Sequence, residues 1–214
     1  MNTHFSPDFL NIADFCLSTA ALGPGLRSVL WVQGCPIGCP GCISPQWIPI
    51  KPAKLIAIES AVEMMLVDSR IEGITISGGE PFLQAAALAK FINLIRMKRD
   101  LHVLVFTGFH HQRLVERPPY PGVQELLAQI DIIVDGPYVE ALNQGDTFAG
   151  SRNQRILRLT NRQDPGDGKW PLRDLEIHIR NGSLLTVGIP PLNLNREQLS
   201  SSIKNYRTAP SEAA

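Results

Sequence analysis

The stretch SVLWVQGCPIGCPGC, residues 28–42, changes character abruptly at Gly34. Its first seven residues are apolar and rich in β-formers, which predicts a short strand buried on both faces. The next eight positions carry three thiols, Cys35, Cys39 and Cys42, separated almost entirely by Gly and Pro. Gly permits unusual backbone dihedrals and Pro fixes others, so this segment is neither helix nor strand. We expect a loop that follows the strand and points three sulfur atoms at one place.

Composition limits the class of protein. The chain has 214 residues, of which 44% are hydrophobic and 19% charged, which suits one domain, or one domain with an appendage, around a sizeable core. Its 20 basic and 20 acidic residues cancel, so general attraction to nucleic acid or to an acidic membrane is not expected. No signal peptide is recognisable, and no segment approaches the roughly 18 apolar residues of a membrane span. We therefore expect a cytoplasmic protein, in which clustered cysteines more often bind metal or carry redox chemistry than form disulfides.

Strand-like and helix-like segments alternate along most of the chain. The predicted strands are residues 28–34, 73–79, 101–108, 131–136 and 154–160. The predicted helices are residues 57–70, 82–100 and 122–130. This alternation predicts an α/β fold with a parallel sheet and right-handed crossovers, either open or curled towards a barrel. Active sites of such folds lie at the carboxyl ends of the strands, which is where the cysteine loop is expected.

The last quarter of the chain has a different pattern. Residues 175–189 alternate between apolar and polar and are interrupted by Asn-Gly at 181–182, a strong signal for a β-hairpin. Residues 190–214 predict a short helix and then a polar end. We therefore expect a core domain over residues 1–162 and a C-terminal extension over residues 163–214.

The clustered thiols have several possible roles. Thiolates bind soft metals and iron–sulfur clusters. A structural zinc site would need a fourth protein ligand, for which Cys16, His110 and His111 are candidates. Three unliganded buried thiols are the plainest alternative, and Cys16 itself reads as a small buried hydrophobe. A four-iron cluster held by three cysteines would instead leave one iron open to a small molecule.

A second motif, ISGGEP at residues 76–81, ends the next predicted strand. Its two glycines allow a ligand to approach the backbone closely, and Glu80 adds a carboxylate, although GGEP alone reads equally well as a strand-to-helix turn. The spacing C-x3-C-x2-C after one strand, with GGEP after the next, resembles the radical S-adenosylmethionine (SAM) superfamily. This resemblance implies a [4Fe-4S] cluster bound by Cys35, Cys39 and Cys42, with SAM as the second cofactor.

The resemblance also implies a fold and a reaction. The fold is a partial parallel (β/α)6-type barrel with a C-terminal β-hairpin extension, and the cluster lies at its open top. An electron from the cluster cleaves SAM to methionine and a 5'-deoxyadenosyl radical, which takes a hydrogen atom from the substrate. No catalytic residue is implied beyond the cluster and SAM.

Several stretches are similar to the activating proteins of glycyl-radical enzymes, above all those of the anaerobic ribonucleotide reductase type. These stretches are SPQW at 44–47, FTGF at 106–109, Asp-Gly-Pro at 135–137 and AGSRNQRIL at 149–157. The similarity implies a glycyl-radical partner protein and an electron donor such as flavodoxin or ferredoxin, with neither nucleic acid nor membrane as a partner. A radical SAM enzyme that modifies a peptide or small metabolite, and a non-catalytic zinc or cluster protein, stay open as alternatives.

The resemblance assigns cofactor-binding roles to eight residues: Gly41, Ile43, Ser77, Gly78, Gly79, Glu80, Thr107 and Asp135. The first two flank the third cysteine and are expected near the adenine, and residues 77–80 are expected at the methionyl end of SAM. Thr107 and Asp135 close later strands, although Asp135 before a Gly is equally a turn former. We expect Trp31 in the strand core, Trp47 packed over the cysteine loop, and His110 and His111 in a loop. The predicted hairpin covers the barrel mouth, docks a partner or seals a sheet edge.

Overall fold

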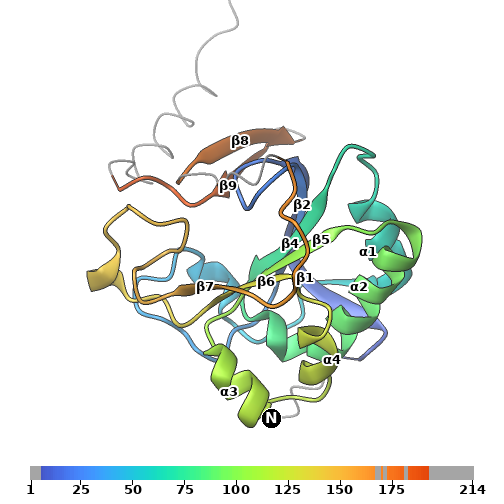
Figure 1. Cartoon of the computed structure of the whole chain (residues 1–214), viewed down its shortest axis with the longest axis horizontal. Coiled ribbons are helices and arrows are strands. Elements are labelled where there is room, and N and C mark those ends of the chain that lie inside the picture. Colours follow the sequence, from blue (N-terminus) through green and yellow to red (C-terminus); the bar gives the residue numbers. More distant parts are fainter. Residues whose placement is uncertain (1–5, 167–169, 171–172, 181–182, 193–214) are drawn as a thin grey trace, which may run out of the picture.

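The computed structural model describes residues 6–166, 170, 173–180 and 183–192. Within these residues, a seven-stranded sheet has the strand order β3-β1-β2-β4-β5-β6-β7 (Figure 1). Its strands are β1 (Phe9–Thr19), β2 (Arg27–Val32), β3 (Lys54–Ala57), β4 (Gly73–Gly78), β5 (His102–Phe106), β6 (Ile132–Asp135) and β7 (Arg155–Arg158). The helices are α1 (Ile58–Met65), α2 (Ala85–Lys98), α3 (His111–Glu116) and α4 (Val123–Leu127). Three short 3-10 turns are η1 (Pro45–Trp47), η2 (Pro81–Gln84) and η3 (Glu140–Leu142).

Four neighbouring strands, β2, β4, β5 and β6, run parallel, as the alternating strand and helix segments predicted. All six residues of β2 are buried, and residues 29–32 form the apolar run that predicted the strand, whereas Arg27 and Ser28 are buried polar residues. Because the strands are parallel, their carboxyl ends meet at one edge of the sheet, where Val32 of β2 lies opposite Gly78 of β4. This edge carries the cysteine loop and the glycine-rich motif.

The outer strands differ from the prediction. The last predicted strand, now β7, pairs antiparallel with β6, and β1 pairs antiparallel with both β2 and β3. The expected parallel sheet of about six strands is therefore wrong for the outer strands, because the sheet is mixed. Strand β1 was not predicted, since irregularities in its pairing near Asp14 and again before Thr19 disturb the two-residue alternation of buried side chains. Closure of the sheet into a partial barrel stays a prediction.

The two faces of the sheet are covered by different parts of the chain. On one face, Leu30 and Val32 of β2 pack into the main core with α1, α2 and α4, where Leu88, Phe91, Ile92 and Ile95 form the buried stripe predicted for α2. On the other face, Val29 and Trp31 pack with Val187 from the C-terminal extension. No helix in the described part of the chain is long and apolar enough to cross a bilayer.

The predicted hairpin is present as β8 (Leu175–Arg180) and β9 (Ser183–Gly188), and its turn at 181–182 lies outside the described residues. Among the described strands, β8 and β9 pair only with each other, so the hairpin does not extend an edge of the main sheet. It lies over β1 and β2, away from α1 and α2 (Figure 1). The predicted terminal helix lies largely in residues 193–214, outside the described residues, and the domain boundary at residue 162 stays a prediction.

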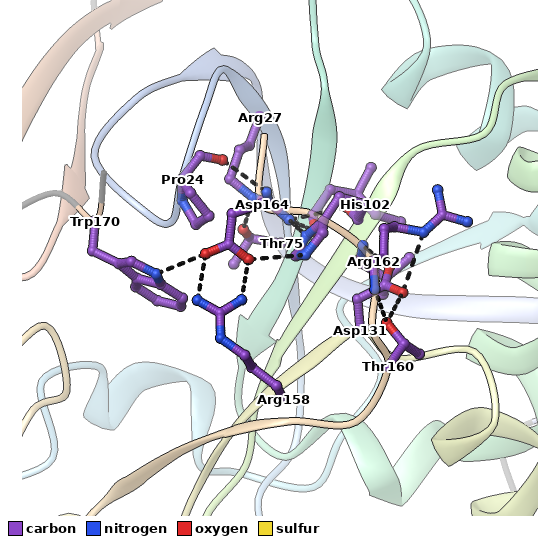
Figure 2. A network of polar contacts seen from close by, with 12 residues as sticks. Pro24, Arg27, Thr75, His102, Asp131, Arg158, Thr160, Arg162, Asp164 and Trp170 are labelled. Atoms are coloured by element: carbon purple, nitrogen blue, oxygen red, sulfur yellow. Dashed lines mark hydrogen bonds and ion pairs between the residues drawn. The ribbon is translucent and has the colours of Figure 1, made fainter. Parts of the chain in front are cut away.

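A polar network closes the opposite edge of the sheet, where the parallel strands begin (Figure 2). Arg27 is fully buried and donates hydrogen bonds to Thr75 Oγ1 at 2.8 Å and to the carbonyl oxygens of Pro24 and Ile74 at 3.0 and 2.6 Å. Burial lowers the pKa of Arg27 to about 9, although nearby carboxylates oppose that shift. A buried guanidinium with this many partners fixes the start of β2 to its neighbour β4.

The same network ties the C-terminal extension to the sheet. Asp164 forms an ion pair with Arg158 and accepts a hydrogen bond from Trp170 Nε1 at 3.0 Å. His102 Nε2 lies 3.9 Å from Asp164. Burial and the neighbouring Arg27 lower the pKa of His102 to about 4, so the imidazole is neutral at neutral pH. The extension is therefore anchored beside the starts of the strands, before it reaches the other face of the sheet.

Candidate active site

A cavity of about 500 Å³ lies at the carboxyl ends of the parallel strands. This volume falls within the usual range for small-molecule sites, about 300–1,000 Å³. The sequence-predicted site residues that line it are Cys35, Cys39, Gly41, Cys42, Ile43, Ser77, Gly78, Gly79, Glu80 and Thr107. The structure therefore brings together residues from the cysteine loop, from the end of β4 and from the end of β5.

The cysteine loop is closed at its base by main-chain hydrogen bonds. The N–H of Gly34 donates to the carbonyl oxygen of Trp47, and that of Cys35 donates to Ile48, both at 2.9 Å. Trp47 packs beside Trp31 of β2, with ring centroids 5.7 Å apart. Trp31 is therefore in the strand core, as the sequence predicted, whereas packing of Trp47 over the cysteine loop stays a prediction. The loop leaves the sheet and returns at a fixed point, which holds the three thiols over the end of β2.

The three thiols are free and partly buried. Burial raises the pKa of Cys35 and that of Cys39 above the ordinary thiol value. In the described part of the chain, no three His, Cys, Asp or Glu side chains converge closely enough to hold a single metal ion. A tetrahedral zinc site, with its four ligands at about 2.0–2.3 Å from the metal, is therefore not preformed here. A four-iron cluster places its thiolate ligands farther apart than a single metal ion does, and all three clustered cysteines line the cavity.

The candidate fourth zinc ligands lie elsewhere. Cys16 is buried on β1, as its interpretation as a small hydrophobe predicted, and its sulfur lies 3.8 Å from Nε2 of His178 on the hairpin. His111 begins α3, so the expectation that it lies in a loop is wrong. With a single buried residue, Leu114, that short helix has no periodic apolar pattern to reveal it. Neither His110 nor His111 is among the described residues that line the cavity.

Two glycines press the glycine-rich motif against the cysteine loop. Gly78 has a φ of +107°, and a Cβ there would lie 2.5 Å from the backbone nitrogen of Val32. A Cβ on Gly79 would lie 2.2 Å from the carbonyl oxygen of Gly34. The N–H groups of Gly79 and Glu80 donate to the carbonyl oxygens of Val32 and Gly34, both at 2.8 Å. Any larger side chain at these two positions would push the motifs apart.

Glu80 is fully buried, and its carboxylate is held by donors from the protein itself. Oε1 accepts hydrogen bonds from Thr107 Oγ1 at 2.8 Å and from the N–H of Phe82 at 3.0 Å, and Oε2 accepts from the N–H of Gly108 at 2.9 Å. Burial raises the pKa of Glu80 to about 7, although these three hydrogen bonds oppose the shift. The side chain therefore connects the end of β4 to the end of β5, and its carboxylate accepts the hydrogen bond that the hydroxyl of Thr107 donates.

Asp135 is not among the described residues that line the cavity. Its carboxylate forms an ion pair with Arg155 of β7 and accepts a hydrogen bond from the N–H of His111 at 2.7 Å. Burial raises its pKa, but Arg155 and that N–H outweigh burial and hold the pKa below its usual value. The next residue, Gly136, does line the cavity. A cofactor-binding role for Asp135 thus stays a prediction, and the contacts describe a brace between β6, β7 and α3.

Other residues that line the cavity were not assigned to it from the sequence. Leu22, Phe106, Tyr138, Asn143, Gln154, Arg173, Ile189 and Pro190 belong to this group. Gln154 lies in the stretch AGSRNQRIL, and Tyr138 follows Asp-Gly-Pro, so the similarity to activating proteins offered a signal for both. Arg173 and Ile189 come from the C-terminal extension. The sequence pattern there predicts a hairpin but does not indicate which of its residues face the cavity.

The donor set and the shape of this cavity fit the two implied cofactors. Three partly buried thiols from one loop offer soft ligands to an iron–sulfur cluster. The neighbouring backbone at Gly78 and Gly79 is kept free of side chains, and its close packing leaves no room for a Cβ. A ligand beside the thiols would therefore meet main-chain groups, as expected for the polar end of SAM.

Comparison with known proteins agrees with this geometry. Residues 21–157 match the family described as "4Fe-4S single cluster domain". The chain is 27% identical over 153 residues to the "anaerobic ribonucleoside-triphosphate reductase-activating protein" of Enterobacteria phage T4, covering 69% of this chain and 90% of the relative. It is 31% identical over 147 residues to the protein of the same name from Vibrio cholerae, covering 64% of this chain and 91% of the relative.

Two further similarities are more limited. A "pyruvate formate-lyase-activating enzyme" of Staphylococcus aureus is 38% identical over 74 residues, which is 32% of this chain and 30% of the relative. The crystal structure of QueE from Escherichia coli superposes with a TM-score of 0.40 and 17% identity, over 48% of this chain and 54% of that one. The family match includes all three clustered thiols and also Gly78 and Gly79. The chain therefore belongs to the 4Fe-4S single cluster domain family. The prediction from its two motifs, that the protein is a radical SAM enzyme, is confirmed.

Proposed function

We propose that this protein activates a glycyl-radical enzyme of the anaerobic ribonucleotide reductase type. The observation that carries the proposal is the convergence of Cys35, Cys39 and Cys42 with Gly78 and Gly79 in one cavity at the ends of parallel strands. The relatives that the chain matches over most of their length carry the name of such activating proteins. When bound, the reduced cluster supplies the electron that splits SAM into methionine and a 5'-deoxyadenosyl radical able to take a hydrogen atom from a glycine.

The residues of this chain would hold the cofactors rather than react with the substrate. Cys35, Cys39 and Cys42 would ligate the cluster, and the backbone from Ser77 to Gly79 would bind the methionyl end of SAM. Gly41 and Ile43 would lie near the adenine. Glu80 would act as a positioning residue, because its carboxylate is occupied by Thr107 and by main-chain donors. Apolar groups such as Trp31 and Phe106 would exclude water from the reacting atoms.

The proposed reaction needs two partners. One is a glycyl-radical protein, whose glycine has to reach the cavity on a loop. The other is an electron donor such as flavodoxin or ferredoxin. A second candidate function is modification of a peptide or small metabolite by the same radical chemistry. It is favoured by one observation, that residues of the C-terminal extension also line the cavity and could shape a pocket for a different substrate.

Anaerobic reconstitution tests the chemistry and the substrate separately. The protein is expected to bind iron and sulfide and to form deoxyadenosine from SAM and dithionite. Addition of the organism's anaerobic ribonucleotide reductase is expected to give a glycyl radical signal in electron paramagnetic resonance. Deoxyadenosine without a radical on that partner would favour the second candidate function. A colourless protein that binds zinc and does not bind SAM would overturn both.

Replacement of single cysteines tests the cluster ligands. Cys42→Ala is expected to lower the iron content and to abolish deoxyadenosine formation, because it removes a ligand of the cluster. Cys16→Ala is the matched control, since Cys16 is buried under the hairpin and is not among the described residues that line the cavity. If the two variants lose iron to the same extent, the assignment of the cluster to this loop is wrong.

A further inference from the structure

The C-terminal extension reaches the same cavity as the clustered thiols. Arg173, Gly188, Ile189 and Pro190 all line it, although the matched family segment ends at residue 157. Ile189 packs against the cluster that contains Val29 and Trp31, on the sheet face opposite the helix-covered one. One side of the active site is therefore built from chain that the family match does not include.

Arg173 fixes a loop of the core domain from this side. Its Nε donates to the carbonyl oxygen of Thr147 at 2.9 Å, and its Nη2 donates to those of Ala149 and Gly150 at 3.0 and 2.8 Å. Gly150 itself lines the cavity. Three hydrogen bonds from one planar guanidinium to three carbonyl oxygens of the same loop hold that loop more rigidly than a single bond would. The position of the cavity wall at Gly150 therefore depends on Arg173.

Aromatic packing supports the same loop. Phe148 has its ring centroid 5.6 Å from that of Phe106 and 5.1 Å from that of Trp170. Phe106 ends β5 and lines the cavity, whereas Trp170 belongs to the extension. The loop at 147–150 is thus held between the sheet on one side and the extension on the other.

The hairpin fixes the second part of this wall. Val187 of β9 is fully buried, in a cluster with Leu22 and Trp31, both of which line the cavity. Glu176 of β8 accepts hydrogen bonds from Thr19 Oγ1 at 2.6 Å and from the N–H of Ala20 at 2.8 Å. These contacts place the residues that follow β9, including Ile189, against the cavity.

We infer that the C-terminal extension is a specificity wall of the active site, and that Ile189 and Arg173 decide which substrate segment can approach the SAM-derived radical. Ile189 acts by contact and Arg173 acts as a positioning residue for the 147–150 loop. The inference rests on the proposed function for the identity of the substrate, a glycine-bearing loop of a partner protein. Hydrogen abstraction requires close approach, so a wall displaced by about 1 Å changes transfer far more than it changes cofactor binding.

The test compares wall residues with a residue on the outer surface of the same hairpin. Ile189→Ala and Arg173→Ala are measured beside Ile177→Ala, because Ile177 is 51% exposed and is not among the described residues that line the cavity. The quantity measured is the amount of glycyl radical formed on the partner per deoxyadenosine released. It is expected to fall roughly tenfold in the two wall variants, as for a misfitted apolar group in a specificity pocket, and to stay unchanged in Ile177→Ala.

A conservative variant separates positioning from charge. Arg173→Lys keeps the charge but cannot donate three hydrogen bonds in the planar arrangement, so it is expected to behave like Arg173→Ala in this ratio. Restoration of the ratio by lysine would overturn the positioning role. A ratio that is the same in the wall variants and in wild type would overturn the specificity wall, whatever happens to SAM cleavage.

Thiol labelling tests the wall without any activity. In the cluster-free protein, a bulky maleimide and the small reagent iodoacetamide compete for Cys35, Cys39 and Cys42, and mass spectrometry measures the labelling rates. The wall variants are expected to accelerate labelling by the maleimide several-fold more than labelling by iodoacetamide, and Ile177→Ala is expected to change neither. Equal acceleration of both reagents, or of neither, would overturn the wall. If wild type makes no deoxyadenosine, the proposed function fails, while this labelling result still decides the inference.

Discussion

The backbone N–H of Glu80 donates a hydrogen bond to the carbonyl oxygen of Gly34 at 2.8 Å. Gly34 precedes the first clustered cysteine, and Glu80 follows the pair Gly78-Gly79, so this bond joins the two motifs that we propose to bind the cofactors. Parallel pairing of β2 with β4 brings them into register, with Val32 opposite Gly78. The geometry of the thiols therefore depends on main-chain packing by residues that carry no ligand atoms themselves.

Gly79→Ala is expected to disrupt this junction. Its Cβ would lie 2.2 Å from the carbonyl oxygen of Gly34, a distance at which backbone has to move. Overpacking of this kind costs about 1–3 kcal/mol or more, and the shift displaces the cysteine loop. We expect a lower midpoint in urea denaturation and a clear loss of iron after reconstitution.

Gly38→Ala is the matched control inside the cysteine loop. A Cβ there would meet nothing within 4 Å, so the variant carries only the strain of a φ of +60°, about 1–2 kcal/mol. It is expected to keep its iron. If it loses as much iron as Gly79→Ala, strain in the loop rather than contact between the motifs governs cluster binding.

Glu80 predicts a pH dependence of stability. Burial raises its pKa from 4.5 to about 7, so the folded state binds this proton more tightly than the unfolded chain does. The contribution of Glu80 to the free energy of unfolding is therefore fully present below about pH 4.5 and is lost as the pH rises to about 7. Glu80→Gln stays neutral and lacks this loss. Between pH 5 and pH 8, its stability is expected to improve relative to wild type by about 2 kcal/mol in urea denaturation.

A constant difference between wild type and Glu80→Gln across this pH range would show that the carboxylate is already ionised at pH 5. The three donors at Thr107, Phe82 and Gly108 would then outweigh burial. Thr107→Val is the companion variant, because it removes one donor and is expected to raise the pKa of Glu80 further. Its stability should therefore decline over a wider pH range than that of wild type.

The central strands could be predicted because strands that are buried on both faces consist largely of apolar residues. β2 shows this in residues 29–32, which are all apolar and buried, although the strand begins with the buried polar residues Arg27 and Ser28. β1 could not be found in this way, because its irregular pairing around Asp14 breaks the alternation. The antiparallel direction of β7 could not be predicted either, because the sequence of a four-residue strand does not indicate whether it runs parallel to its neighbour.

In the candidate site, too, some features could be predicted from the sequence and others could not. Cys35 and Gly79 could be predicted because their chemistry and spacing are local in the sequence. The brace between Glu80 and Thr107 depends on two side chains 27 positions apart, and the wall at Arg173 depends on the loop at 147–150. Such contacts follow from tertiary packing, which leaves no periodic pattern in either partner.

Arg27 is expected to be essential for stability. Arg27→Met fills a similar space but leaves Thr75 and the carbonyl oxygens of Pro24 and Ile74 buried without their donor (Figure 2). Loss of one partner from a buried polar network of this kind costs about 3–5 kcal/mol. Urea denaturation should show this loss, and Arg70→Met, which removes an exposed arginine paired with Asp68, should leave the midpoint unchanged. A midpoint for Arg27→Met equal to that of wild type would mean that apolar packing replaces the network.

Glu176 is expected to control the attachment of the hairpin. Its carboxylate accepts hydrogen bonds from Thr19 Oγ1 at 2.6 Å and the Ala20 N–H at 2.8 Å and lies 2.9 Å from His178 Nε2. Burial raises its pKa, but these partners outweigh burial and hold the pKa below its usual value. The stabilisation is therefore present above about pH 4.5 and is lost as the pH falls through the lowered pKa of the folded state.

Glu176→Ala should loosen the hairpin without unfolding the core. Loss of these hydrogen bonds leaves Thr19, which is 2% exposed, without its acceptor, at a cost of about 1–3 kcal/mol. Hydrogen exchange of amides in β8 and β9 is expected to accelerate about tenfold, while amides in β4 and β5 keep their rates, since local opening need not involve the central sheet. Ile177→Ala on the outer surface should leave the exchange rates of the hairpin unchanged. Equal acceleration in β4 would instead mean that the hairpin and the central sheet open as one cooperative unit, and that the extension cannot move independently of the cofactor cavity.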